Sequence, residues 1–73
     1  MSRLPVVSGR DFVRAMAKLG FIEDRRKGSH IIIFRADPQT TLSVPDHHEL
    51  DRGTLRGLLR QAGVSPAEFS KLL

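Results

Sequence analysis

The sequence predicts a two-layer α+β domain with the element order α-β-β-β-α and a further short helix at the C-terminus. Two segments, one in each half of the chain, carry apolar residues at the i, i+3, i+4, i+7 spacing of a buried helix face. Between them lie three short runs of β-prone residues, separated by two turn sequences. Strands joined by short turns pair antiparallel, so we expect a three-stranded meander with the helices on one face and the other face open.

The length of the chain indicates one domain spanning residues 1–73. A domain of this size buries only about 60% of the surface that its unfolded chain exposes, so its core is thin. The absence of cysteine excludes a disulfide or a thiolate metal site and fits a reducing, cytoplasmic setting. No signal-peptide pattern and no apolar run of about 20 residues is present, so we expect a cytoplasmic protein without a membrane span.

The first helix is predicted to begin after Ser8, which is a good N-cap. Asp11 follows three residues later and resembles the second half of a capping box. Gly20 is expected to end the helix in a left-handed conformation. The apolar face of this helix consists of Phe12, Ala15, Met16 and Leu19.

Three strands are predicted over residues 21–26, 29–35 and 40–44. Lys27-Gly28 is expected to form the first turn, because glycine adopts backbone angles that other residues avoid. Asp37-Pro38-Gln39 has the composition of the second turn, and Pro45 is expected to stop the third strand.

The second helix is expected to begin at Asp51 and to end at Gly63. Its apolar face consists of Leu55, Leu58, Leu59 and Ala62. Ser65-Pro66-Ala67-Glu68 is a strong start signal for a last short helix, with an N-cap serine, proline at the first helical position and glutamate at the third.

The basic stretch over residues 25–30 carries the main functional signal. It places His30 where a glycine turn becomes a rigid strand, beside Arg25, Arg26 and Lys27. The chain has 12 basic and 8 acidic residues and a net charge of +4, which favours an anionic partner such as nucleic acid. A titratable group held rigidly beside positive charges suits RNA cleavage. The alternative is a strand histidine satisfied by a hydrogen bond to the backbone.

Five pieces of the sequence, in order, resemble the HicA toxins of bacterial toxin–antitoxin pairs. Together they span almost the whole chain, and His48 is one departure from the family's pattern. The pieces are Leu4-Pro5-Val6-Val7-Ser8-Gly9, Leu19-Gly20-Phe21, Lys27-Gly28-Ser29-His30, Val44-Pro45-Asp46-His47, and Gly53-Thr54-Leu55-Arg56 continuing to Gln61-Ala62-Gly63-Val64-Ser65.

This resemblance implies a double-stranded-RNA-binding-domain-like fold and a ribonuclease that cleaves mRNA and arrests growth. It also implies a HicB antitoxin as partner, in a hetero-oligomer with the toxin, and it maps the family's functional histidine onto His30. Two other readings stay open: a non-catalytic RNA-binding module, and an interaction domain whose basic faces meet an acidic antitoxin.

RNA carries its own nucleophile, the 2′-hydroxyl, so a nuclease without a metal needs only to move protons and to stabilise the phosphorane. An imidazole suits both proton transfers because its ordinary pKa is about 6.5. Arg25, Arg26 or Lys27 is expected to stabilise the phosphate, while Ser29 bonds the phosphate or orients the ring. The second proton carrier is left open between water and a lysine.

Further RNA contacts are expected from the turn at Gly28 and from Arg52 and Arg56 at the start of the second helix, since a domain of this fold grips RNA through shape and phosphates. Base stacking is not expected, because the chain has no tyrosine or tryptophan and its phenylalanines look like core residues. Those phenylalanines are Phe12, Phe21, Phe34 and Phe69.

His47 is the candidate for a second acid/base or an RNA contact. The alternative is a loop histidine that bonds the backbone near the start of the second helix. The three histidines, His30, His47 and His48, make only a weak case for zinc, because no Cys or H-E-x-x-H spacing accompanies them. We therefore expect no metal and no cofactor.

Overall fold

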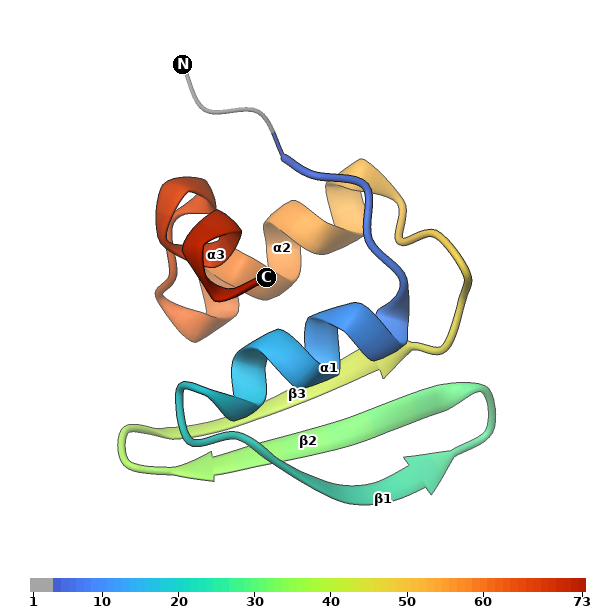
Figure 1. Cartoon of the computed structure of the whole chain (residues 1–73). Coiled ribbons are helices and arrows are strands. Elements are labelled where there is room, and N and C mark those ends of the chain that lie inside the picture. Colours follow the sequence, from blue (N-terminus) through green and yellow to red (C-terminus); the bar gives the residue numbers. More distant parts are fainter. Residues whose placement is uncertain (1–3) are drawn as a thin grey trace.

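The computed structural model describes residues 4–73 and confirms the predicted α+β architecture (Figure 1). Three strands form one antiparallel sheet in the order β1-β2-β3. The elements, in chain order, are α1 (Gly9–Ala17), β1 (Ile22–Lys27), β2 (His30–Ala36), β3 (Gln39–Pro45), α2 (Arg52–Ala62) and α3 (Pro66–Leu72). This order is consistent with a double-stranded-RNA-binding-domain-like fold.

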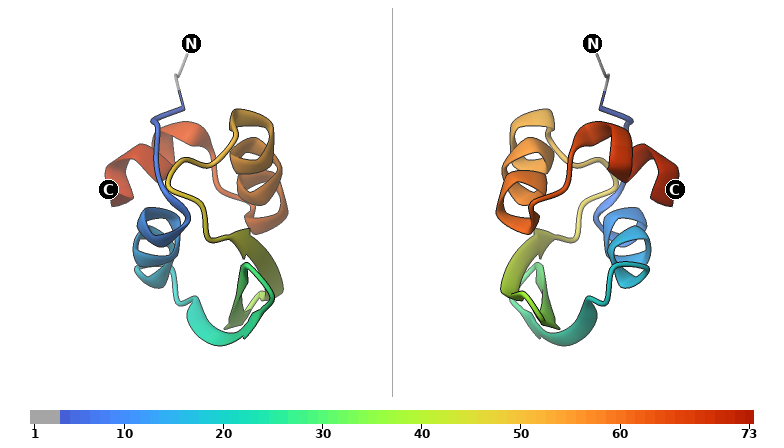
Figure 2. Two further views of the ribbon diagram at one scale, coloured as in Figure 1. Left: turned by 90° about the vertical axis from the view of Figure 1, so that its right-hand side faces the viewer. Right: turned by 90° about the vertical axis from the view of Figure 1, so that its left-hand side faces the viewer.

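The three helices lie together on one side of the sheet, and its other side is open (Figures 1 and 2). Alternate residues of β2 and β3 point toward the helices and are fully buried there, namely Ile31, Ile33, Leu42 and Val44. The rings of Phe12 and Phe69 join α1 to α3 in the same core, with their centroids 5.5 Å apart. The main apolar core of the described chain therefore lies between the sheet and the helices, and Ile32, which is buried on the other face of β2, is outside it.

Phe34 corrects one expectation. Phe12, Phe21 and Phe69 belong to the core, as predicted, but Phe34 is only half-buried and does not. The reason is strand alternation: Ile33 and Phe34 are neighbours in β2, so their side chains point to opposite faces. Because Ile33 faces the helices, Phe34 lies on the open face.

The predicted caps are present. Ser8 and Ser65 each complete a capping box, with Asp11 and Glu68 respectively, and the Asp51 carboxylate accepts a hydrogen bond from the Thr54 N–H. These hydrogen bonds lower the pKa of the Asp11 and Glu68 carboxyls, the bond from the backbone N–H of the capping serine being the main cause in each.

The element boundaries differ slightly from the predicted ones. Regular α1 ends at Ala17, and Gly20, with φ of +92°, makes the left-handed turn into β1. The first hairpin turn is Gly28-Ser29 instead of Lys27-Gly28, because Lys27 still pairs with His30. The shifted turn shows that the first strand ends where cross-strand pairing stops, not where residue preference changes.

Close backbone packing fastens α1 to the end of β3. A Cβ atom at Gly9 would stand 2.1 Å from the Pro45 carbonyl oxygen, so only glycine fits there. The Gly9 N–H donates to the His47 carbonyl at 2.9 Å, and the Leu50 N–H donates to the Val7 carbonyl at 2.8 Å. This network holds the loop after β3 against the start of α1.

Within residues 4–73, the helices are too short and too polar for any of them to traverse a bilayer.

Candidate active site

His30 is the first residue of β2, at the junction of the first hairpin turn and the strand. It pairs with Lys27 of β1 on one side and with Pro45 of β3 on the other. Its neighbour Ile31 is buried beneath the helices, so the half-buried His30 ring lies on the open face. A ligand can therefore approach the ring from the side of the sheet that no helix covers.

Ser43 holds one nitrogen of this ring. The Nδ1 atom of His30 and the Oγ atom of Ser43 lie 2.7 Å apart in a hydrogen bond. Ser43 pairs with Ile32, two residues further along β2, so it is the diagonal cross-strand neighbour of His30 on the same face. The Nε2 atom has no hydrogen-bond partner within residues 4–73.

Ser43 is missed by reasoning from the sequence, which considers Ser29 for bonding the phosphate or for orienting the ring. The structure instead uses Ser29 through its backbone, whose carbonyl accepts the Asp46 N–H at 2.9 Å. The register of β2 against β3 is the signal that identifies Ser43, and it follows only once the position of the second turn is known. The exposed turn residues Gly28 and Ser29 lie next to the ring in sequence.

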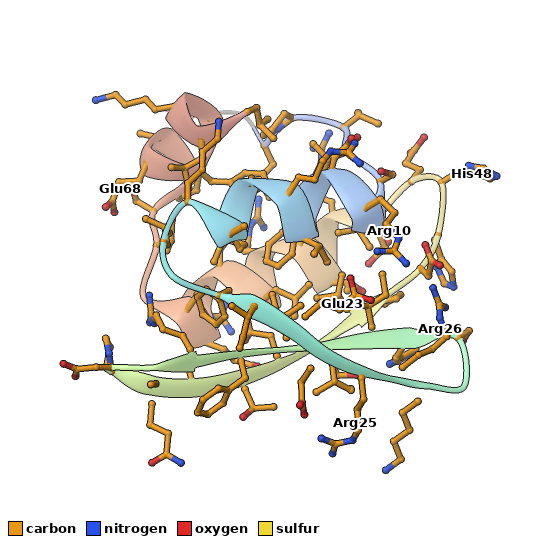
Figure 3. The ribbon with its side chains drawn as sticks, turned by 60° about the horizontal axis from the view of Figure 1, so that its bottom comes forward. Arg10, Glu23, Arg25, Arg26, His48 and Glu68 are labelled. Carbon is orange, nitrogen blue, oxygen red and sulfur yellow. The ribbon has the colours of Figure 1, made fainter. Side chains whose placement is uncertain are left out.

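A β-bulge in β1 decides which cations share the face of His30. The pairing skips Asp24, so Glu23 lies opposite Ile33 and Arg25 lies opposite Ile32. The extra residue resets the alternation, and Arg25 and Lys27 then point to the open face. Figure 3 shows Arg25 on the side away from the helices, whereas Glu23 and Arg26 point toward them.

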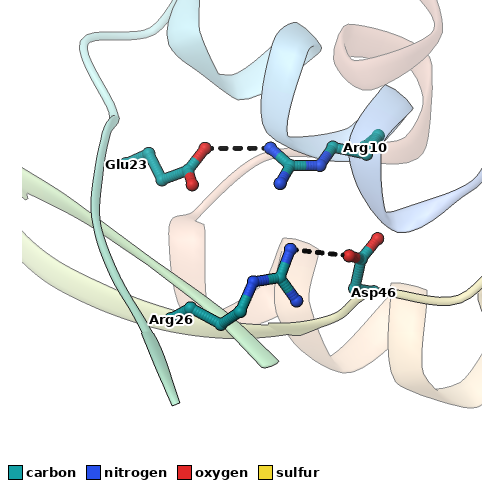
Figure 4. A network of polar contacts seen from close by, with 4 residues as sticks. All are labelled: Arg10, Glu23, Arg26 and Asp46. Carbon is teal, nitrogen blue, oxygen red and sulfur yellow. Dashed lines mark hydrogen bonds and ion pairs between the residues drawn. The ribbon is translucent and has the colours of Figure 1, made fainter. Parts of the chain in front are cut away.

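The residues of β1 that face the helices form ion pairs there. Arg10 of α1 contacts Glu23 at 3.0 Å, and Arg26 contacts Asp46 at 2.8 Å (Figure 4). The hydrogen bond from Arg26 is the main cause of the lowered pKa of the Asp46 carboxyl. Arg26, predicted to touch RNA, thus has its guanidinium engaged in tying the hairpin to the loop after β3.

The two cations on the open face differ in their surroundings. Arg25 is ion-paired with its neighbour Asp24, and both side chains are largely exposed. Lys27, which lies directly opposite His30, makes no ion pair or side-chain hydrogen bond with residues 4–73. Lys27 is accordingly the cation best placed to meet an anion beside His30.

The remaining predicted residues lie elsewhere. Arg52 and Arg56 are exposed on α2, and this helix lies on the side of the sheet opposite the open face that carries His30. His47 and His48 are exposed in the loop after β3, and the bonded His47 carbonyl serves the start of α1, not of α2. Within residues 4–73, the histidines and carboxylates form no cluster suited to a metal ion.

The arrangement provides an imidazole with one nitrogen anchored and the other open. A hydroxyl at Nδ1 accepts an N–H or donates an O–H, so it fixes the ring orientation in either tautomer. The open Nε2 can then exchange a proton with a ligand on the sheet face. Lys27 and Arg25 supply positive charge on the same face, which suits a phosphate.

Comparison with known proteins identifies the family of the chain. None of the curated proteins matches it. The family model described as the HicA toxin of bacterial toxin–antitoxin systems matches residues 9–64, from the first residue of α1 to the residue after the C-cap of α2. HicA toxins are known as mRNA interferases, and a toxin of this kind implies an antitoxin partner. On the strength of a match to more than half of its length, the chain belongs to the HicA toxin family of bacterial toxin–antitoxin systems.

Proposed function

We propose that this HicA toxin is a metal-independent endoribonuclease that cleaves mRNA in the cytoplasm and thereby arrests translation and growth. His30 is its proton-transfer residue. The observation that carries the proposal is the hydrogen bond between His30 Nδ1 and Ser43 Oγ, which leaves Nε2 open on a sheet face that also carries Lys27 and Arg25.

In the proposed reaction, the 2′-hydroxyl of the RNA loses its proton to Nε2 of His30. The freed oxygen attacks the adjacent phosphorus, and the bond from phosphorus to the 5′-oxygen breaks. Throughout this transfer the Nδ1–H donates to Ser43 Oγ, because both the neutral ring with a free Nε2 and the imidazolium carry a proton on Nδ1. Ser43 therefore holds the ring in the same orientation before and after Nε2 takes the proton.

The phosphorane carries more negative charge than the ground-state phosphate, and cations fixed at its position lower the barrier. Lys27 lies directly across from His30 and is assigned this role, with Arg25, in the next pair on the same face, as a second cation. The leaving 5′-oxygen takes a proton from Lys27 or from water. The products are a 2′,3′-cyclic phosphate and a 5′-hydroxyl, and every proton and bond is accounted for without a bound cofactor.

The test compares three purified proteins on a labelled RNA. His30→Ala is expected to abolish cleavage and growth arrest, since general acid–base residues contribute about 10²- to 10⁴-fold. His48→Ala is the matched control, because His48 is exposed in a loop, and it is expected to cut RNA like the parent. Circular dichroism must show the same fold for all three. A folded His30→Ala protein with full activity would exclude the proposed role.

The non-catalytic alternative makes a different prediction in the same assay. A module that blocks translation by occupying RNA would leave the labelled strand intact, both with the parent and with His30→Ala. Shortened RNA with cyclic phosphate ends in the parent reaction rules that alternative out.

We further propose that a HicB-like antitoxin neutralises the toxin by covering His30 and the adjacent hairpin turn. The site lies on an uncovered face, and the described chain has no segment left over to act as a lid. Carboxylates of the partner would take the place of the phosphate beside Lys27 and Arg25, which makes association fast and sensitive to salt.

A competition titration tests this control. Labelled RNA bound to His30→Ala should be displaced by one equivalent of antitoxin for each site. A stable ternary complex of toxin, antitoxin and RNA would show that the antitoxin binds elsewhere.

A further inference from the structure

The open face of the sheet is arranged in three cross-strand rows. Each row takes one residue from β1, one from β2 and one from β3, and all of them point away from the helices. The rows are Lys27-His30-Pro45, Arg25-Ile32-Ser43 and Ile22-Phe34-Thr41. The first row holds the candidate catalytic group. The second holds a cation and the ring's anchor on either side of the buried Ile32, and the third holds two large apolar side chains and a threonine.

The third row exposes apolar surface that the fold does not use. Ile22 is 65% exposed. Among residues 4–73, two other large apolar side chains are strongly exposed, those of Val6 and Leu73, and both lie outside the sheet, before α1 and after α3. Phe34, the cross-strand partner of Ile22, is an aromatic ring left half-buried outside the core. Large apolar side chains that reach solvent side by side on one face are typical of a binding surface.

From this arrangement we infer that the row Ile22-Phe34-Thr41 is a nucleobase platform, on which an unpaired base of the substrate RNA stacks against Phe34. The inference rests on the proposed function of His30 and extends it to the class of RNA that is bound. A strand rises about 3.4 Å per residue, so Phe34 lies about 14 Å along β2 from His30. An RNA strand seated on the platform would pass Arg25 before it reaches the catalytic row.

Single-stranded RNA fits the sequence of rows better than an RNA duplex. Base faces are stacked and covered within a duplex, and A-form RNA offers mainly 2′-hydroxyls and phosphates to a protein. A single strand presents an apolar base face together with its anionic backbone, and aromatic stacking beside cations is how proteins hold such strands. Apolar, cationic and catalytic rows in succession provide these contacts along one face.

The experiment measures RNA binding in the His30→Ala background, where cleavage cannot interfere. A labelled single-stranded RNA is titrated against His30→Ala alone and against the same protein with Phe34→Leu, Ile22→Thr or Val6→Thr. Phe34→Leu keeps an apolar side chain and removes the stacking ring, and it is expected to weaken binding roughly 5- to 150-fold, the range found when one stacking side chain is replaced by alanine. Ile22→Thr should weaken binding in the same direction by less.

Val6→Thr is the matched control for Ile22→Thr. It also exchanges a β-branched apolar side chain for threonine, at a position that is 73% exposed but away from the open face, and it should bind RNA like the parent. Ile22 is mostly exposed, so its variant keeps the proposal testable if thermal melting shows that Phe34→Leu is unfolded.

A double-mutant cycle with abasic RNA identifies stacking itself. An abasic nucleotide is placed at each position in turn around the cleavage site. At one position, removal of the base should weaken RNA binding to His30→Ala but should leave binding to His30→Ala/Phe34→Leu unchanged. Duplex RNA of the same sequence should bind more weakly than the single strand.

Two outcomes would overturn the platform. The first is that Phe34→Leu and Ile22→Thr bind single-stranded RNA as tightly as His30→Ala alone does, and that removal of a base at any RNA position leaves the affinity unchanged. The second is weakened antitoxin binding with unchanged RNA binding, which would assign the face to the protein partner. Neither outcome depends on cleavage, so failure of the platform is distinguishable from failure of His30 as the catalytic residue.

Discussion

Ser43→Ala isolates the contribution of the ring's anchor to cleavage. The substitution removes the oxygen that lies 2.7 Å from Nδ1 of His30 and leaves the imidazole in place. A hydrogen bond to a charged group contributes about 1.5–3 kcal/mol, and Ser43 is exposed, so water replaces part of the loss and the lower value applies. About 1.4 kcal/mol corresponds to a tenfold change in rate. We expect kcat to fall about tenfold with KM nearly unchanged.

Ser43→Thr is the matched control, because threonine keeps the hydroxyl and suits a β-strand. It should retain most of the activity that Ser43→Ala loses. Nitrogen chemical shifts of the His30 ring give a second readout, since loss of the hydrogen bond at Nδ1 should change the shift of that nitrogen. Equal losses in both variants, or a loss confined to KM or to the melting temperature, would refute a positioning role for Ser43.

The remaining predictions concern the metal, the packing and the charges. Cleavage should persist in EDTA, checked on the labelled RNA. Gly9→Ala should cost roughly 2 kcal/mol or more of the free energy of unfolding in chemical denaturation, because its Cβ would meet a backbone carbonyl oxygen at 2.1 Å. Deleting the bulged residue Asp24 should spare cleavage, whereas deleting Arg25 should impair it by placing a carboxylate on the open face. The hydrogen bond from Arg26 lowers the pKa of Asp46 in the folded protein. The bond therefore stabilises the fold fully at pH values above the ordinary Asp pKa of about 3.8, and this stabilisation is lost as the pH falls through the lower pKa of the folded state. Asp46→Asn should flatten this acid dependence in melting experiments.

The sequence predicts most of this fold because its local signals agree with one another. Capping residues, turn glycines and helix-spaced apolar residues each identify one element, and packing overrides none of them. Strand ends were misplaced by a residue because pairing, not preference, decides where a strand stops. Phe34 was assigned to the core because four successive apolar residues in one strand, Ile31 to Phe34, hide the alternation that separates its two faces.

The candidate site was predictable only in part, and β1 shows why. His30 could be placed because a turn glycine and a β-branched run fix its position. All six residues of β1 are exposed, so no hydrophobic alternation in its sequence specifies which residues face the helices. Side-chain orientation on this edge strand depends instead on contacts from elsewhere in the chain, and neither the partner residues nor the bulge at Asp24 can be read from residues 22–27 alone.

The ion pairs on the helix side of β1 thereby determine the chemistry of the opposite side. Arg10 holds Glu23 before the bulge, and Asp46 holds Arg26 after it. Because both of these side chains turn toward the helices, the two residues between them, Asp24 and Arg25, must share one position in the ladder. Arg25 takes the paired position opposite Ile32, on the face of His30. A regular strand with Asp24 paired would place a carboxylate in that row and turn Arg26 outward. The selection of cations beside His30 is therefore a consequence of charges that never approach the substrate.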